Sequence, residues 1–140
     1  MSNTVCHMTT VHSRTDVRIF RKECLSLAKA GFNVVLLIAD QKGDETSSGI
    51  KIKDLGAYEG FFKRVFLAPI KFMLEGLKQR ARVYHFHDPE LIITGFLLKL
   101  LGKKVIYDIH EDYTTSFAHR SYIPKFIVII SSFFWRLYEG

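Results

Sequence analysis

Cysteine is scarce in this sequence, and its scarcity excludes the small folds that depend on disulfides. The two cysteines, Cys6 and Cys24, lack the spacing of a zinc site and are too few for a disulfide framework. Residues 1–5 contain no basic stretch followed by an apolar one, so no secretory signal is expected. The longest apolar run, residues 126–135, contains two serines and is far shorter than the roughly 20 residues of a membrane span. The protein is therefore expected to be cytoplasmic.

Common nucleotide-binding and nucleophile motifs are also missing. The first apolar segment is not followed by G-x-G-x-x-G, and G-x-x-x-x-G-K-[ST] does not occur. These absences exclude a dinucleotide fingerprint and a P-loop. The G-x-S-x-G motif of the α/β-hydrolase nucleophile does not occur either.

Acidic residues are fewer than basic ones, and most of the excess charge lies in one segment. The net charge is +6, and residues 60–82 contain six basic side chains against one acid, Glu75. Bulky apolar residues are mixed with these charges, as in an amphipathic helix on the inner face of an anionic membrane. An alternative is a helix that packs its apolar face on a sheet. A nucleic-acid partner is not expected, because no recognition motif occurs.

Strand-like and helix-like segments alternate along the chain. The 140 residues, 48% hydrophobic and 24% charged, fit one compact domain. Residues 34–38 are all apolar, which is typical of a strand covered on both faces. The alternation predicts an α/β fold with a doubly wound, Rossmann-like parallel sheet. The expected strands are 5–10, 33–39, 50–55, 83–86 and 104–109, the expected helices are 16–30, 60–82, 89–101 and 124–138, and residues 40–49 are expected to form a polar loop.

Helix boundaries are marked by capping residues. Thr15 or Ser13 is expected to cap the first helix, with Asp16 at the positive end of its dipole and Gly31 after its end. Asp88 occupies an N-cap position before Pro89, where a capping side chain contributes about 1 kcal/mol. Gly102 follows the end of that helix.

Polar segments follow three of the expected strands. If the first strand lies beside the fourth and the fourth beside the fifth, all three segments face one crevice at the carboxyl edge of the sheet. Two arginines near a helix start could also bind an anion together with backbone N–H groups. The candidate residues are His12, Arg14, Asp16 and Arg18 after the first strand, His85, His87, Asp88 and Glu90 around the end of the fourth, and His110, Glu111 and Asp112 after the fifth.

Each of these residues also has a structural explanation. A capping role alone would explain Asp88, and Glu90 lies in a first helical turn, where the helix dipole favours any carboxylate. His85 and His87 point to the same side of their strand, where one of them can be a buried core histidine. A metal-dependent hydrolase using His85, His87 and Asp88 is an alternative, but the sequence offers no clear third and fourth ligand, and no metal or other cofactor is expected.

Three blocks of this sequence together resemble the N-terminal domain of glycosyltransferase family 4-like enzymes. They are the opening segment 9–31, the tetrapeptide His-Asp-Pro-Glu at 87–90, and Gly-Lys-Lys-Val-Ile-Tyr-Asp-Ile-His-Glu-Asp-Tyr at 102–113. The resemblance implies the GT-B architecture, in which two Rossmann-like domains face a cleft. It implies that this domain binds the acceptor, that a second domain binds the nucleotide-sugar donor, and that transfer retains the anomeric configuration without a metal.

The resemblance also assigns roles to residues. His110 corresponds to the family's histidine near the donor sugar and is expected to be catalytic, with Glu111 and Asp112 beside it. The block 87–90 is expected to face the acceptor. The loop 12–18 departs from the family pattern, because it contains no glycine where the family approaches the donor phosphates.

The family's paired-glutamate donor motif lies in the second domain and does not occur in residues 1–140. The chain is therefore expected to be one acceptor-side domain that ends before its last strand and is inactive by itself. The natural setting is synthesis of bacterial surface polysaccharide on a glycan or lipid-linked acceptor. The alternative is a truncated, non-catalytic binding domain that contacts a membrane or protein partner through its last helix.

Overall fold

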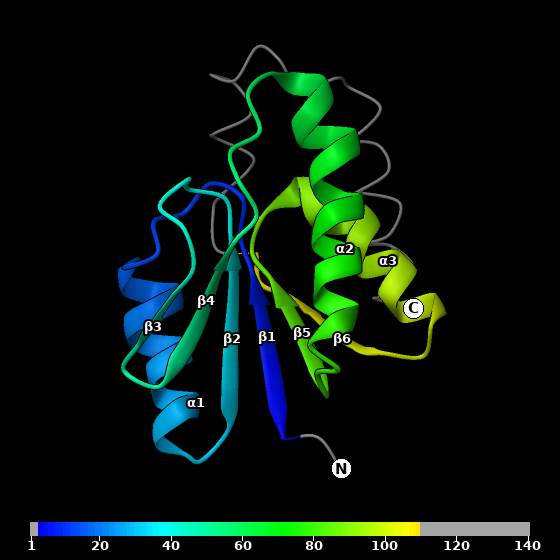
Figure 1. Cartoon of the computed structure of the whole chain (residues 1–140). Coiled ribbons are helices and arrows are strands. Elements are labelled where there is room, and N and C mark those ends of the chain that lie inside the picture. The colour runs from blue at the N-terminus through cyan, green and yellow to red at the C-terminus, as the bar shows by residue number, and fades with distance from the viewer. Residues whose placement is uncertain (1–2, 110–140) are drawn as a thin grey trace. The chain divides into compact units, whose positions relative to one another are not determined.

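The computed structural model describes residues 3–109, which form a mostly parallel sheet flanked by helices (Figure 1). The six described strands lie in the order β3-β4-β2-β1-β5-β6, and of these only β3 pairs antiparallel. The α/β class expected from the sequence is confirmed. The strands are β1 (Thr4–Met8), β2 (Asn33–Ile38), β3 (Glu45–Ser47), β4 (Ile50–Asp54), β5 (Val83–Phe86) and β6 (Lys104–Tyr107).

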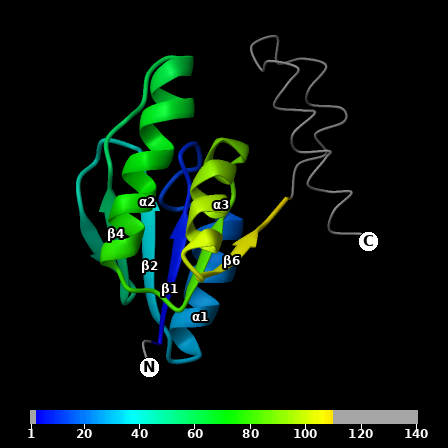
Figure 2. The ribbon, with the colours of Figure 1, turned by 90° about the vertical axis from the view of Figure 1, so that its right-hand side faces the viewer.

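Helices cover both faces of the sheet. The π-helix η1 (Val17–Cys24) and helix α1 (Leu25–Lys29) follow β1 and pack on one face. Helix α2 (Ala68–Lys78), which continues the π-helix η2 (Lys63–Leu67), packs on the other face. There it is joined by the 3-10 helix η3 (Pro89–Leu91) and helix α3 (Ile92–Leu100). Figure 2 shows α1 and α2 on opposite sides of the strands.

The alternation of side chains along β2 divides the core into two halves. Val34, Leu36 and Ile38 pack with η1, whereas Val35 and Leu37 pack with α2 and α3. All five are buried, which explains why this strand is apolar throughout. The sequence prediction of a strand covered on both faces is confirmed.

Helix η1 begins differently from the expectation. Its N-cap is Asp16, whose Oδ1 accepts hydrogen bonds of 2.8 Å from the backbone N–H groups of Arg18 and Ile19. The prediction that Thr15 or Ser13 caps this helix is therefore wrong, because a carboxylate directly before the first turn reaches both donors. Gly31 follows the end of α1 with a φ of +88°, a conformation that glycine adopts without strain.

Two further expectations change within the described residues. The polar loop expected at 40–49 contains β3, an exposed edge strand. Its Glu-Thr-Ser sequence lacks the alternation of apolar and polar residues from which a strand could be predicted. The helix expected at 89–101 begins as the short 3-10 helix η3 and continues as α3, and Gly102 follows it with a φ of +72°. The last helix expected at 124–138 lies outside the described residues.

Strand order reverses between β1 and β5. From β1 the chain moves outward in one direction through β2 to β4 and then returns to add β5 and β6 on the other side. The carboxyl ends of β1 and β5 therefore form the point at which ligands of open α/β sheets bind. Within residues 3–109, no helix combines the length and apolar character that crossing a membrane requires.

Candidate functional site

The site is built where β1 and β5 lie side by side. β1 pairs with β5, and β5 pairs with β6. This is the strand order under which the polar segments after these three strands were expected to face one crevice. The β1–β5 register aligns His7 with His85 and Met8 with Phe86. The segments that follow β1, β5 and β6 therefore leave the same edge of the sheet.

Asp88 joins the loop after β1 to the segment after β5. Its Oδ2 accepts hydrogen bonds from Thr9 Oγ1 at 2.7 Å and from the Thr10 backbone N–H at 2.6 Å. Its Oδ1 lies 3.2 Å from His12 Nδ1. Asp88 occupies the N-cap position of η3 but makes no capping hydrogen bond, so the expected cap is wrong. The carboxylate is instead used by a loop 76–79 residues earlier in the sequence.

The environment of Asp88 favours its ionised form. Burial alone would raise the pKa of Asp88, but hydrogen bonds from His12, Thr9 and the Thr10 backbone outweigh burial and lower it. Asp88 is 2% exposed, so its charge is screened little by solvent. A buried carboxylate at this position stabilises the mutual arrangement of two loops.

Glu90 extends this connection to the other side of the sheet edge. Its Oε1 accepts hydrogen bonds from Thr10 Oγ1 at 2.8 Å and from Arg64 Nη2 at 2.7 Å. Glu90 lies in the first turn of η3, as expected, and its contacts also link η2 to the loop after β1. His12, Asp88 and Glu90 are thus brought together.

The two arginines predicted to bind an anion are each paired with carboxylates. Arg14 is buried and donates to both oxygens of Asp40, at 2.8 and 2.7 Å, and its Nη1 lies 3.0 Å from Glu45. The Arg14 guanidinium holds the pKa of Asp40 below its usual range. Arg18 donates to both oxygens of Asp108 at the end of β6, at 2.8–3.0 Å. These contacts do not favour a shared anion site for Arg14 and Arg18.

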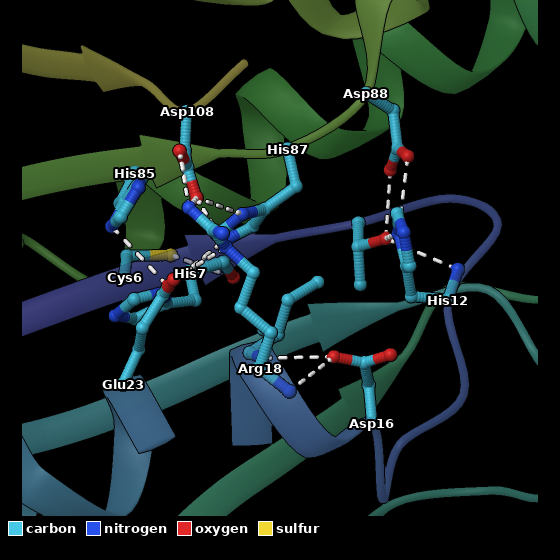
Figure 3. A network of polar contacts seen from close by, with 12 residues as sticks. Cys6, His7, His12, Asp16, Arg18, Glu23, His85, His87, Asp88 and Asp108 are labelled. Carbon is cyan, nitrogen blue, oxygen red and sulfur yellow. Dashed lines mark hydrogen bonds and ion pairs between the residues drawn. The ribbon is translucent and has the colours of Figure 1, made fainter. Parts of the chain in front are cut away.

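A cluster of three imidazoles and one carboxylate lies beside this network (Figure 3). His7, His85 and His87 share one face of the sheet because the register pairs His7 with His85 and side chains alternate along β5. Helix η1 covers this face and contributes Glu23. Glu23 Oε2 lies 3.7 Å from His7 Nδ1, 3.9 Å from His85 Nδ1 and 3.6 Å from His87 Nε2.

The π-helical turn explains why Glu23 reaches the cluster together with Arg18. The N–H of Arg21 bonds to the carbonyl of Asp16, five residues earlier, at 3.1 Å. Such i→i+5 bonds bring residues five apart to the same side of the helix. Arg18 Nε accordingly lies 3.4 Å from Glu23 Oε1. π-helical turns are rare and occur frequently at functional sites.

Burial shifts the pKa of two side chains of the cluster, His7 and Glu23. Burial, followed by the neighbouring His85 and His87, lowers the pKa of His7 well below its usual range. Burial and the nearby Asp108 carboxylate raise the pKa of Glu23 to about 7, against the opposing effect of Arg18. A neutral imidazole offers a nitrogen lone pair, so His7 can act as a base or as a metal ligand.

His85 and His87 were predicted as site residues from the sequence, whereas His7 and Glu23, which supply the third and fourth potential ligands, were not. His7 lies inside an otherwise apolar strand, and Glu23 inside a helix without a recognisable motif. The remaining predicted residues divide between Asp16, which caps η1, and His110, Glu111 and Asp112, which lie outside the described residues.

A cavity of about 230 Å³ lies at the opposite edge of the sheet. Its lining comes mainly from the amino ends of the strands and contains none of the predicted site residues. The switch point carries the concentration of polar and titratable groups, so we place the candidate site there. The cavity is lined by Thr4, Asn33, Val34, Val35, Gly49, Lys51 and Gln79.

No model of a known protein family matches the chain, and a search of curated proteins finds no significant match.

Proposed function

We propose that this chain is the acceptor-side domain of a retaining glycosyltransferase of the GT-B type, with a doubly wound, Rossmann-like sheet. The reaction transfers a sugar from a nucleotide-sugar donor to a glycan or lipid-linked acceptor, in bacterial surface polysaccharide synthesis. One observation carries the proposal. The Asp88 carboxylate binds the loop after β1, so two blocks of the family resemblance, 9–31 and 87–90, meet at the switch point.

The side chains at this edge have the chemistry that sugar binding requires. Thr10 and Glu90 are half-buried and connected to each other, and Ser13 and Thr15 are exposed nearby on the same loop. Hydroxyl and carboxylate groups donate to and accept from sugar hydroxyls. The positions of Thr10 and Glu90 are fixed by contacts with Asp88 and Arg64, which reduces the entropy lost when a ligand binds.

The roles that we propose for this domain and for a second, donor-binding domain follow from the family resemblance. In the transfer, the bond between the anomeric carbon and the leaving phosphate breaks, and the acceptor hydroxyl forms the new bond and loses its proton. His110 assists at the donor sugar, beside Glu111 and Asp112. Groups of a second, donor-binding domain stabilise the charge that develops on the phosphate. Residues 1–140 alone are therefore expected to bind sugar without turnover.

An apolar stripe on η2 and α2 supports a membrane-bound acceptor. Phe62, Phe66, Ile70 and Leu74 recur every four residues and are each more than half exposed among the described residues. Lysines of the same segment lie between them in the sequence, as in helices that bind anionic bilayers. The opposite side of α2 packs on the sheet through buried Phe72. We therefore propose that one face of the segment 60–82 packs on the sheet and that the other binds a membrane surface.

The experiment that tests sugar binding is a titration of the ¹⁵N-labelled chain followed by NMR. The ligands are a panel of nucleotide sugars and, separately, oligosaccharides. We expect saturable shifts of the amides in residues 9–18 and 87–90, because these form the proposed edge. Amides of Asn33, Lys51 and Gln79, which line the cavity at the opposite edge, serve as internal controls.

A matched pair of variants completes this test. Glu90→Gln should weaken oligosaccharide binding about tenfold or more, because a charge-assisted hydrogen bond at the site is replaced by a neutral one. Glu59→Gln, at an exposed position on the segment between β4 and η2, lies outside residues 9–18 and 87–90 and should leave binding unchanged. Absence of saturable shifts with every sugar, or shifts confined to the opposite cavity, would show that the proposal is wrong.

A further inference from the structure

We propose that His7, Glu23, His85 and His87 form a zinc site that joins β1, β5 and η1. The proposal is independent of the glycosyltransferase function and uses a different set of side chains from the Asp88 network. Each residue offers one ligand atom, and these atoms all lie within 4.8 Å of one another.

The separations between ligand atoms fit tetrahedral coordination. Zinc bonds to imidazole nitrogen and carboxylate oxygen are about 2.0–2.1 Å long, so the edges of the tetrahedron are roughly 3.3 Å. His7 Nδ1 and His87 Nε2 are 3.2 Å apart, and Glu23 Oε2 lies 3.6–3.9 Å from nitrogens of the three imidazoles. Small side-chain movements toward a central ion would complete this geometry.

Hydrogen bonding does not account for the position of Glu23 Oε2. The oxygen is buried and makes no hydrogen bond within the part of the chain that the structure describes. Its separations from the three imidazole nitrogens exceed hydrogen-bond length. A buried carboxylate oxygen without a hydrogen bond is costly, and a cation placed between it and the imidazoles would remove that cost.

Residues around the four side chains provide the support that metal ligands need. The opposite ring nitrogen of His87, Nδ1, lies 3.6 Å from Asp108 Oδ2. This separation is slightly beyond hydrogen-bond length, so a small movement would form the carboxylate–histidine pair that orients a ligating imidazole. Arg18 contacts both Asp108 and the other oxygen of Glu23, Oε1, at 3.4 Å. Arg18 therefore holds Glu23 with Oε2 directed into the cluster.

Burial and ligand type point to zinc in a structural role. The His7 and His87 side chains are fully buried, whereas those of His85 and Glu23 are 15% and 22% exposed and provide a route from solvent. Three nitrogens and one oxygen suit Zn²⁺ better than Ca²⁺ or Mg²⁺, which prefer oxygen ligands. Four protein ligands fill a tetrahedral site and leave no position for a reactive water. We therefore expect the metal to stabilise the junction of the three elements and not to hydrolyse a substrate.

The test uses the full chain without a histidine tag, because a tag would bind the same metal. After removal of metal with a chelator, Zn²⁺ is added back and its stoichiometry is measured by mass spectrometry after gel filtration. We expect one ion per chain and a rise in Tm of roughly 5–10 °C at a hundredfold excess over Kd. Co²⁺ in place of Zn²⁺ should give the intense visible bands of tetrahedral coordination.

Variants separate this site from adventitious binding. Glu23→Gln and His85→Asn should each weaken Zn²⁺ binding about 100-fold or more, because each removes one of four ligands. His12→Asn is the matched control, since His12 lies at the same edge but outside the cluster. Equal losses in His12→Asn and His85→Asn would overturn the proposal. Absence of bound zinc together with an unchanged Tm, or an octahedral Co²⁺ spectrum, would overturn it without any variant.

Discussion

Asp88 Oδ2 accepts a 2.6 Å hydrogen bond from the backbone N–H of Thr10, although the two residues are 78 positions apart in the sequence. The same oxygen accepts from the hydroxyl of Thr9. One side chain after β5 thereby fixes the course of the loop after β1. The stability of this part of the fold should depend on that carboxylate and on its ionisation.

Asp88→Asn should lower the free energy of unfolding at neutral pH by about 1–3 kcal/mol, because charge-assisted hydrogen bonds to a buried carboxylate are replaced by neutral ones. The pKa of Asp88 is lower in the folded chain than its usual value. Its contribution is therefore complete above about pH 4 and is lost as the pH falls through the folded pKa. Urea unfolding at about pH 7 and about pH 3 measures both effects.

The pH series has a matched control in Glu59→Gln, which removes a carboxylate at an exposed position. That variant should keep the acid-dependent loss of stability seen in the parent chain. Asp88→Asn should show a smaller loss on acidification than the parent. An equal loss in all three proteins would mean that Asp88 does not contribute through its charge.

Removal of the η1 cap should destabilise the chain through that helix alone. Asp16→Ala should lower the free energy of unfolding by about 1 kcal/mol, because the N–H groups of Arg18 and Ile19 lose their acceptor. Asp16→Asn retains an oxygen acceptor and should cost only a fraction of that. Thermal unfolding of Ser13→Ala and Thr15→Ala should resemble the parent, and a larger effect there would return the cap to the residues first expected.

Binding to lipid vesicles should depend on the apolar stripe of η2 and α2. Phe62→Ser/Phe66→Ser should weaken sedimentation with anionic vesicles about tenfold or more, because two exposed aromatic rings no longer enter the bilayer surface. Leu100→Ser, an equally exposed apolar position on α3, should bind like the parent. High salt should also weaken binding. Equal vesicle binding by the parent and the double variant would show that the apolar stripe does not contact the membrane.

The two cysteines should be unreactive in the native chain. Both are buried, and burial raises the pKa of Cys6 far above its usual range and that of Cys24 to about 12. Since the thiolate is the reactive form, alkylation should be slow until denaturant is added and then proceed at the rate of a free thiol. Mass spectrometry over time measures both rates, and rapid native labelling would indicate opening of the core around β1.

Much of the fold could be predicted from local patterns, whereas the histidine cluster could not. The uninterrupted apolar run of β2 announces a strand covered on both faces, and the glycines after α1 and α3 mark the ends of helices. β3 has no such pattern. Asp88 precedes a helix, so the sequence suggests a capping residue. In the folded chain its carboxylate accepts from Thr9 and Thr10, because the fold brings their donor groups close to it.

His7 and Glu23 were missed for a related reason. His7 becomes a neighbour of His85 only through the β1–β5 register, which is set by the strand order of the whole sheet. Glu23 becomes a neighbour of the same imidazoles only because η1 is wound with i→i+5 bonds. Neither relationship leaves a trace in the spacing of residues along the chain.

The wide turn of η1 has a consequence for how insertions and deletions would be tolerated. Arg18 and Glu23 are five residues apart, and an ordinary α-helix would place residues three or four apart on one side. The π-helical turn therefore accommodates one surplus residue without disturbing the strands on either side. Deleting an exposed residue between them, such as Lys22, would allow a regular α-helix to present the same pair. The addition or loss of a single residue in η1 therefore decides whether the π-helical turn is needed to bring Arg18 and Glu23 to the same side of the helix.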